Sequence, residues 1–152
     1  MMSIDNDSEF KLALNNLSRI ERRLVAARFA ENVLALSNDP RLKAAINATK
    51  QIELGDKELD AAHQSAKAAR VDSFTRCGSE CDWSNQSGHF VAEAVLACVK
   101  PQEPGHNQAW DVAMHARMAR TCEGIANGKG TDNPESGAQY RILTEFLKAL
   151  GN

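Results

Sequence analysis

Cysteine and histidine side chains are the groups in this chain whose types and spacing could do chemistry. Cys77 and Cys81 are separated by three residues, and His89 follows them, which resembles one half of a zinc site. Structural zinc sites usually combine two compact ligand pairs, and the second pair is missing here, although His106 and His115 could add nitrogen ligands. We therefore expect no metal and no other cofactor. The candidate ligands, if a metal is bound, are Cys77, Cys81 and His89.

A cysteine–histidine pair is the second chemistry that the sequence offers. Cys98 could act as a nucleophile if the fold brought it to a histidine. The available bases are His63, His89 and His115. Cys98 and Cys122 lie on alanine-rich apolar stripes, however, where a free cysteine behaves as a small hydrophobic residue. The chain contains no G-x-S-x-G, Walker, H-E-x-x-H or dinucleotide-binding pattern. The sequence therefore predicts no catalytic residues and a protein that is not an enzyme.

Three histidines and one glutamate lie in apolar helical stripes or at the starts of these stripes. His63 falls on the buried stripe of its helix, which is typical of a hydrogen-bonded core histidine. His89 and His106 each follow a glycine at an expected helix start, where a ring nitrogen can accept from an unpaired backbone N–H or donate to a neighbouring loop. Glu93 is the lone carboxylate within an apolar helix. We expect it to reach the surface rather than to pair with a residue such as Arg117.

The elements that must position these residues are helices. Apolar residues recur at helical spacing through residues 87–122, with a Pro/Gly break at 101–105, and we interpret this stretch as a central antiparallel hairpin. Its many alanines allow neighbouring backbones to approach closely. Aromatic residues make up only 5% of the chain, and runs of β-branched residues are rare. We therefore predict an all-α fold, a compact bundle of six or seven helices built from antiparallel helical hairpins, in a single domain over 1–152.

Local signals give the approximate bounds of the first helices. A short helix occupies the N-terminal residues 1–17. Ser18 and Glu21 then form a capping box for a helix that runs to about Ser37. The arginines on the outer side of this second helix are interpreted as a solvent-exposed face. They are Arg19, Arg22, Arg23 and Arg28.

Prolines and glycines set the remaining boundaries. Pro40 opens a helix whose buried stripe reaches Ile52, and Gly55 is placed to end it. The stretches 71–87 and 124–133 are rich in Gly, Ser and Asp, and we predict both as loops. A last amphipathic helix follows the second loop.

The overall composition argues against several classes of partner. Eighteen basic and 20 acidic residues give a net charge of −2, so the electrostatic support that a nucleic-acid partner needs is missing. No apolar run approaches the roughly 18–20 residues of a membrane span, and we expect no membrane partner. Residues 1–9 are polar and acidic, unlike an export signal. We therefore expect a cytoplasmic protein with reduced cysteines.

Four short segments follow one another in an order that is found in a known family. They are Asn38-Asp39-Pro40-Arg41, Gly55, Ala61-Ala62-His63 and Ser87-Gly88-His89. In this order the chain resembles the alanine-rich, all-helical immunity proteins of bacterial polymorphic toxin systems, and the similarity covers about Ala30 to Ala119. The resemblance implies a helical scaffold that binds a cognate toxin, and it brings no catalytic residues with it.

Binding of this kind needs exposed anchor side chains on a rigid scaffold. The candidate partner-binding residues are Trp83, Trp110 and Phe74. Two other interpretations stay open: a small helical metal-binding or cysteine/histidine-dependent enzyme, and an adaptor or scaffold whose partner is not a toxin. An exposed apolar stripe could also join two copies of the chain in a homodimer.

Overall fold

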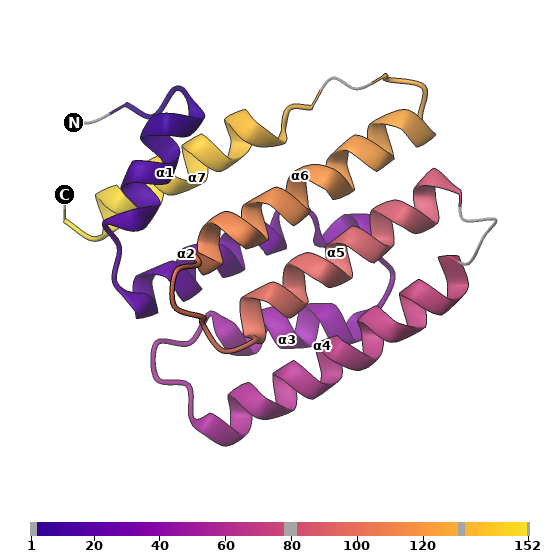
Figure 1. The fold of residues 1–152 in the computed structure, drawn as a ribbon, viewed down its shortest axis with the longest axis horizontal. Coiled ribbons are helices and arrows are strands. Elements are labelled where there is room, and N and C mark those ends of the chain that lie inside the picture. The colour runs from indigo at the N-terminus through magenta and orange to yellow at the C-terminus, as the bar shows by residue number, and fades with distance from the viewer. Residues whose placement is uncertain (1–2, 78–81, 131–132, 152) are drawn as a thin grey trace.

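The fold consists of helices throughout the part of the chain that this computed structural model describes, residues 3–77, 82–130 and 133–151 (Figure 1). This confirms the predicted all-α class. In chain order the elements are α1 (Asp7–Asn15), α2 (Arg19–Glu31), the 3-10 helix η1 (Leu34–Leu36), α3 (Pro40–Thr49), α4 (Asp56–Cys77), α5 (Trp83–Val99), α6 (Gln108–Ala126) and α7 (Glu135–Ala149). None of the described helices is long and apolar enough to cross a membrane.

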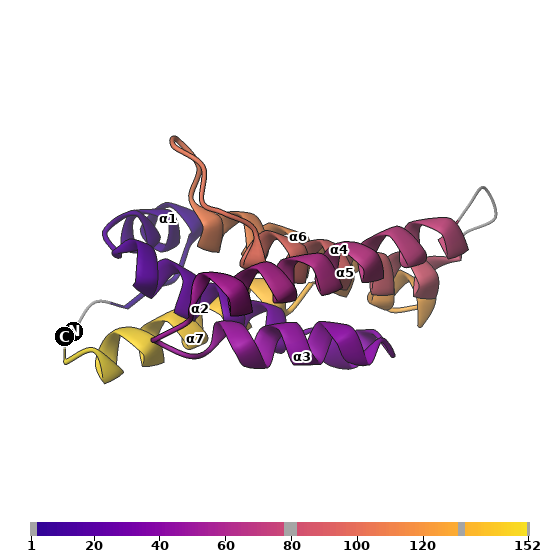
Figure 2. The ribbon, with the colours of Figure 1, turned by 90° about the horizontal axis from the view of Figure 1, so that it is seen from below.

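The helices lie in two layers (Figures 1 and 2). One layer contains α4, α5 and α6, which run antiparallel with α5 in the middle. The second layer contains α3, α2 and α7, and α1 covers one end of the bundle beside α6. The pair α5–α6 is the predicted central hairpin. Its facing alanines, such as Ala94, Ala113 and Ala116, are fully buried, so the two backbones approach closely.

Caps predicted from the sequence begin two of the helices. At α2 the Glu21 N–H donates to Ser18 Oγ (3.2 Å) and the Ser18 N–H donates to Glu21 Oε1 (2.8 Å), which is the complete capping box. At α3 the Arg41 N–H donates to Asp39 Oδ1 (3.0 Å), with Pro40 in the first helical position. These local signals therefore set the starts of α2 and α3.

The predicted ends of α2 and α3 are wrong. Helix α2 ends at Glu31 and gives way to η1, and α3 ends at Thr49, so Ile52 is 68% exposed instead of buried. The guanidinium of Arg23 lies beyond the end of α3 and takes up its last carbonyls. It donates to the carbonyl oxygens of Thr49 (2.6 Å), Gln51 (2.8 Å) and Ile52 (3.1 Å). These bonds satisfy carbonyls that a continuing helix would otherwise have satisfied.

Arg22 acts in the same way at the end of α1, where it donates to the carbonyls of Leu14 (3.2 Å) and Asn15 (2.8 Å). The interpretation of these α2 arginines as a merely solvated face is therefore wrong for Arg22 and Arg23. Each of them fixes the end of a neighbouring helix.

Most of the predicted loop 71–87 is helical. Helix α4 continues to Cys77 and α5 already begins at Trp83. The polar residues that suggested a loop are satisfied inside the helix, because Ser73 Oγ donates to the Arg70 carbonyl (2.8 Å) and Thr75 Oγ1 to the Val71 carbonyl (3.0 Å). The predicted loop 124–133 is likewise shorter, since α6 includes the buried Gly124 and ends at Ala126. Cys81 lies outside the described residues.

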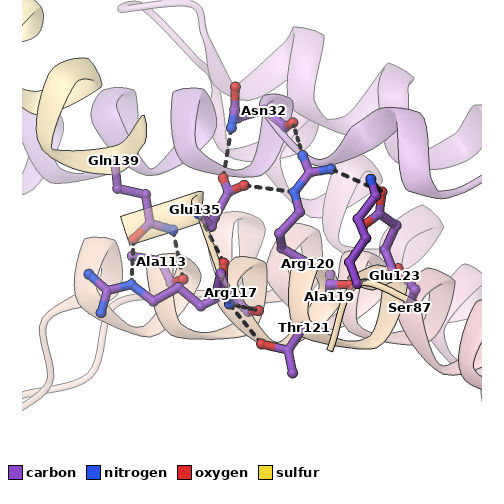
Figure 3. A network of polar contacts seen from close by, with 12 residues as sticks. Asn32, Ser87, Ala113, Arg117, Ala119, Arg120, Thr121, Glu123, Glu135 and Gln139 are labelled. Carbon is purple, nitrogen blue, oxygen red and sulfur yellow. Dashed lines mark hydrogen bonds and ion pairs between the residues drawn. The ribbon is translucent and has the colours of Figure 1, made fainter. Parts of the chain in front are cut away.

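A buried polar network holds α7 against α2 and α6 (Figure 3). Glu135, only 1% exposed, accepts from Asn32 Nδ2 (2.7 Å) and Arg120 Nε (3.1 Å). Along the same seam Arg117 Nε donates to Gln139 Oε1 (2.8 Å), and Gln139 Nε2 donates to a carbonyl of α6 (2.9 Å). Because each of these side chains is paired, the network specifies where α7 lies.

Candidate functional site at the α4–α5 end

A cavity of about 480 Å³ opens where the start of α3, the end of α4 and the start of α5 meet. Its size falls in the range of small-molecule sites, and its lining combines apolar and polar side chains. The apolar lining includes Leu36, Leu42, Ala69 and Ala92. The polar lining includes Asp39, Arg41, Ser73, Arg76, Ser84, Asn85 and His89.

Glu93 lies beside this cavity and pairs across the α4–α5 contact. Its Oε1 accepts from Arg70 Nε on α4 at 2.6 Å and lies 3.4 Å from His89 Nε2, one helical turn away on α5. The Glu93 side chain is 19% exposed. The expectation that this carboxylate reaches the surface unpaired is therefore wrong. Its partner is Arg70 because α4 packs alongside α5, which the sequence of α5 alone does not reveal.

His89 connects this ion pair to the cavity. Its Nδ1 lies 2.9 Å from Ser73 Oγ, and its ring contacts the rings of Phe74 (centroids 5.9 Å apart) and Phe90 (5.8 Å). Burial lowers the pKa of His89 below its usual 6.5; Glu93 opposes this effect, and Arg70 adds to it. The ring is therefore neutral at pH 7. His89 lies well inside α5, so the expected contact with a first-turn N–H is wrong.

The other histidines divide into one inside the bundle and two near its surface. His115 on α6 has a buried Nδ1 without a hydrogen-bond partner, and burial lowers its pKa while the nearby Glu93 opposes the shift. His106 is exposed and precedes α6, and Asn107 takes the predicted capping role by accepting from two first-turn N–H groups. His63 is half-buried on α4. Only His89 and His115 therefore belong to the α4–α5–α6 cluster around Glu93.

An arginine closes one side of the cavity. Arg41 binds Asp39 (2.7 Å) and also Asp72 of α4 (2.9 Å), and this contact lowers the pKa of the Asp39 carboxyl. Arg76 lines the same cavity and has no ion-pair partner among the described residues. One guanidinium of the cavity, that of Arg41, thus forms two ion pairs, and the charge of the other, that of Arg76, helps to lower the pKa of the Asp39 carboxyl.

Cys98, the candidate nucleophile, does not line this cavity. Cys98 is fully buried beside Thr49 Oγ1 (3.8 Å), and burial raises the pKa of its thiol to about 12. A nucleophilic thiolate at Cys98 is therefore inconsistent with its surroundings. The described residues contain no group of three or more His, Cys, Asp or Glu that could hold a metal ion, and the prediction for Cys77 and Cys81 stays untested because Cys81 lies outside them.

The three candidate anchors differ in exposure. Phe74 is 65% exposed and Trp83 is 45% exposed, at the end where α4 leads into α5 (Figure 1). Trp110 is half-buried at the opposite end of α6, against Phe10 (centroids 6.1 Å apart) and under Lys11 Nζ (4.5 Å). The two exposed aromatic candidates therefore lie at the same end of the molecule as the cavity.

Comparisons with protein families, with curated proteins and with solved structures find no match to this chain. Function has to be argued from the geometry described above. Sequence reasoning missed Ser73 and Arg76 because it placed the end of α4 in a loop, and it missed Arg70 because the packing of α4 against α5 was not foreseen. The absence of glycine and proline from residues 71–77 was the signal that could have indicated that the helix continues there.

Proposed function

We propose that this protein is a cytoplasmic immunity protein that neutralises a cognate bacterial toxin by tight binding, with the α4–α5 end as the contact surface. One observation carries the proposal. Two segments of the resemblance, Asn38–Arg41 and Gly88–His89, are far apart in the sequence but line the same cavity, beside the exposed Phe74 and Trp83. Two of the four segments of the resemblance and two of the three candidate anchors thus lie at one end of the fold, while Gly55 and Ala61–His63 lie at the start of α4.

The physical chemistry of this end suits a protein partner. Exposed aromatic side chains on helices lose little conformational freedom on binding, and such residues dominate the energy of many interfaces. Charged groups of both signs surround them, including Arg76 and the Arg41–Asp72 pair. Neutralisation by occlusion needs only this combination of rigid anchors and charge complementarity, without any reactive group.

The test begins with the partner. The tagged protein is purified from its native cells, and a co-purifying protein is identified by mass spectrometry. We expect one stoichiometric partner that stops growth when it is expressed alone and is harmless when this protein is co-expressed. A harmless partner would favour the adaptor interpretation, a second copy of this chain would favour the homodimer, and the absence of a partner would contradict the proposal.

A pair of double variants then tests the surface. Phe74→Ala with Trp83→Ala should weaken toxin binding at least about 100-fold, because each truncation at an interface centre costs about 2 kcal/mol. The matched control is Leu12→Ala with Ile52→Ala, two exposed apolar side chains on α1 and between α3 and α4. We expect the control to bind and protect like the unmodified chain. Equal binding by both double variants would move the interface away from the α4–α5 end.

A further inference from the structure

We propose that Ser73, His89 and Glu93 form a hydrolytic site for small acyl esters in the cavity between α3, α4 and α5. This inference does not depend on the toxin. The order of contacts is that of a nucleophile, a base and an orienting acid: Ser73 Oγ lies 2.9 Å from His89 Nδ1, and His89 Nε2 lies 3.4 Å from Glu93 Oε1. Such a triad is recognised by geometry and roles, whatever the order of the residues in the chain.

The protonation state of His89 suits the role of a general base. Burial keeps the pKa of His89 low, so the ring is neutral and able to accept a proton at pH 7. The charged groups around the ring are Arg70 on α4 and Glu93 on α5, with the titratable His115 on α6. Arg70 Nε holds Glu93 at 2.6 Å, so the carboxylate is fixed where it can stabilise a positive ring. Arg70 and Glu93 are positioning residues.

One small rearrangement activates the nucleophile. In the resting structure the Ser73 hydroxyl donates to the Arg70 carbonyl (2.8 Å). Rotation of its O–H bond toward His89 Nδ1 requires no heavy atom to move, because the oxygen is already within hydrogen-bond distance of that nitrogen. His89 then carries its own proton on Nε2, the side of Glu93.

The cavity supplies room for an ester and donors for its oxygen. Ser73 and His89 both line its wall, and its volume of about 480 Å³ admits a small acyl group with its alcohol. Arg76, Ser84 and Asn85 line the same space and can donate hydrogen bonds to the negative oxygen of a tetrahedral intermediate. The apolar base of the cavity suits the hydrocarbon part of the acyl chain.

The reaction proceeds in two balanced halves. Ser73 Oγ bonds to the acyl carbon and its proton passes to His89 Nδ1; the carbon–alcohol bond then breaks, and His89 returns that proton to the departing alkoxide, which leaves as the alcohol. Water attacks the acyl-Ser73 and gives a proton to His89 Nδ1. The bond to Ser73 breaks, the proton goes back to Ser73 Oγ, and a carboxylic acid is released.

Covalent labelling tests the nucleophile. A fluorophosphonate probe reacts with an activated serine by forming an Oγ–phosphorus bond with loss of fluoride. We expect one adduct on the intact protein, located at Ser73 by peptide mass spectrometry, and slow hydrolysis of p-nitrophenyl acetate whose rate rises with pH as His89 deprotonates. Mapping on the unmodified chain does not depend on the folding of any variant.

Variants separate a catalytic role from a structural one. Ser73→Ala should abolish the adduct, and His89→Gln should slow labelling and hydrolysis at least about 100-fold, the usual contribution of a general base. Ser65→Ala on the same helix is the matched control and should react like the unmodified chain. The proposal is overturned if Ser73 carries no adduct under conditions that label a known serine hydrolase in the same tube. It is also overturned if His89→Gln, with an unchanged circular-dichroism melt, is labelled at the full rate.

Discussion

The α6–α7 seam and the α4–α5 end both contain arginines and carboxylates within an alanine-rich bundle, but they use them differently. At the seam Glu135 is buried and accepts from both Asn32 and Arg120, and Gln139 is bonded at both its amide oxygen and its nitrogen (Figure 3). At the α4–α5 end the ion pair Arg70–Glu93 is only partly buried, beside a cavity whose Arg76 has no ion-pair partner among the described residues. The first arrangement positions a helix, whereas the second leaves polar groups available for a ligand or partner.

Aromatic side chains show the same contrast. Near the seam the rings of Phe10 and Tyr140 are in tilted contact with centroids 5.4 Å apart, and Arg117 covers both while it binds Asp7 at 2.8 Å. At the α4–α5 end Phe74 extends into solvent. A side chain that the fold needs is enclosed by its neighbours, and one that the fold does not need is a candidate for binding. Substitutions at the seam should therefore lower stability, whereas substitutions at the α4–α5 end should weaken binding and leave stability almost unchanged.

The largest effect on stability is expected at Glu135. Glu135→Ala removes the buried acceptor of the Asn32 amide and the Arg120 guanidinium, and removal of one partner from such a network costs about 3–5 kcal/mol. The measurement is the free energy of unfolding from urea titration. The matched control is Glu123→Ala, because Glu123 lies farther from the same arginine (3.9 Å) and closer to solvent, and it should cost less than about 1 kcal/mol. Equal losses of unfolding free energy in the two variants would show that the hydrogen bonds of the seam do not determine where α7 packs.

Local signals in the sequence predicted the helices, but they could not predict the contacts between helices. The capping box at Ser18, the proline at the start of α3 and the alanine stripes of α5 and α6 are each decided within a few residues of chain, and they were confirmed. The role of Arg23 depends on carbonyls more than twenty residues away, which no local pattern contains.

The candidate site follows the same rule. Phe74, Trp83 and Trp110 could be named from residue type alone, because aromatic residues are enriched among interface anchors, but their exposure, which separates Trp110 from the other two, depends on the fold. The contact between Ser73 and His89 could not be predicted, since it depends on how far α4 and α5 are shifted along each other, and that shift is set by packing. Placing residues 71–77 in a loop removed this contact from consideration altogether.

The second effect concerns Arg23 at the end of α3. Arg23→Ala removes three hydrogen bonds to main-chain carbonyls and should lower the free energy of unfolding by about 2 kcal/mol. Lys50→Ala is the control, since Lys50 pairs with Glu31 on the surface of the same region and should change stability by less than about 0.5 kcal/mol. Hydrogen exchange should show faster opening of residues 46–52 in the arginine variant only. Unchanged exchange there would mean that the end of α3 is held by packing.

The third effect is a dependence on pH that separates the two regions. His89 and His115 have folded pKa values below their ordinary 6.5, so the unfolded chain binds their protons more tightly. Their contribution to the free energy of unfolding is fully present above pH 6.5. It is lost as the pH falls from 6.5 toward the pKa values of the two histidines in the folded protein. Asp7 at the seam has a pKa lowered by Arg117, so its contribution is present above 3.8 and is lost only as the pH falls below that.

Urea titrations at a series of pH values measure this difference. We expect the free energy of unfolding to decline already between about pH 7 and pH 5, the interval in which ordinary histidines titrate. The double variant His89→Gln with His115→Gln should flatten this interval and leave the decline below pH 3.8 in place. The converse variant Asp7→Asn should change only the more acidic part. A decline between pH 7 and pH 5 that survives the double histidine substitution would place its origin elsewhere.

The smallest effect on stability is expected where the largest effect on binding is proposed. Phe74→Ala with Trp83→Ala removes side chains that are 65% and 45% exposed, so little apolar area returns to water and the free energy of unfolding should change by less than about 1 kcal/mol. Phe10→Ala, at a fully buried ring, should cost about 3–5 kcal/mol and serves as the reference. A loss above about 2 kcal/mol for the exposed pair would show that the fold depends on these rings. Their exposure would then no longer support a partner surface at the α4–α5 end, because their presence would already be explained by packing.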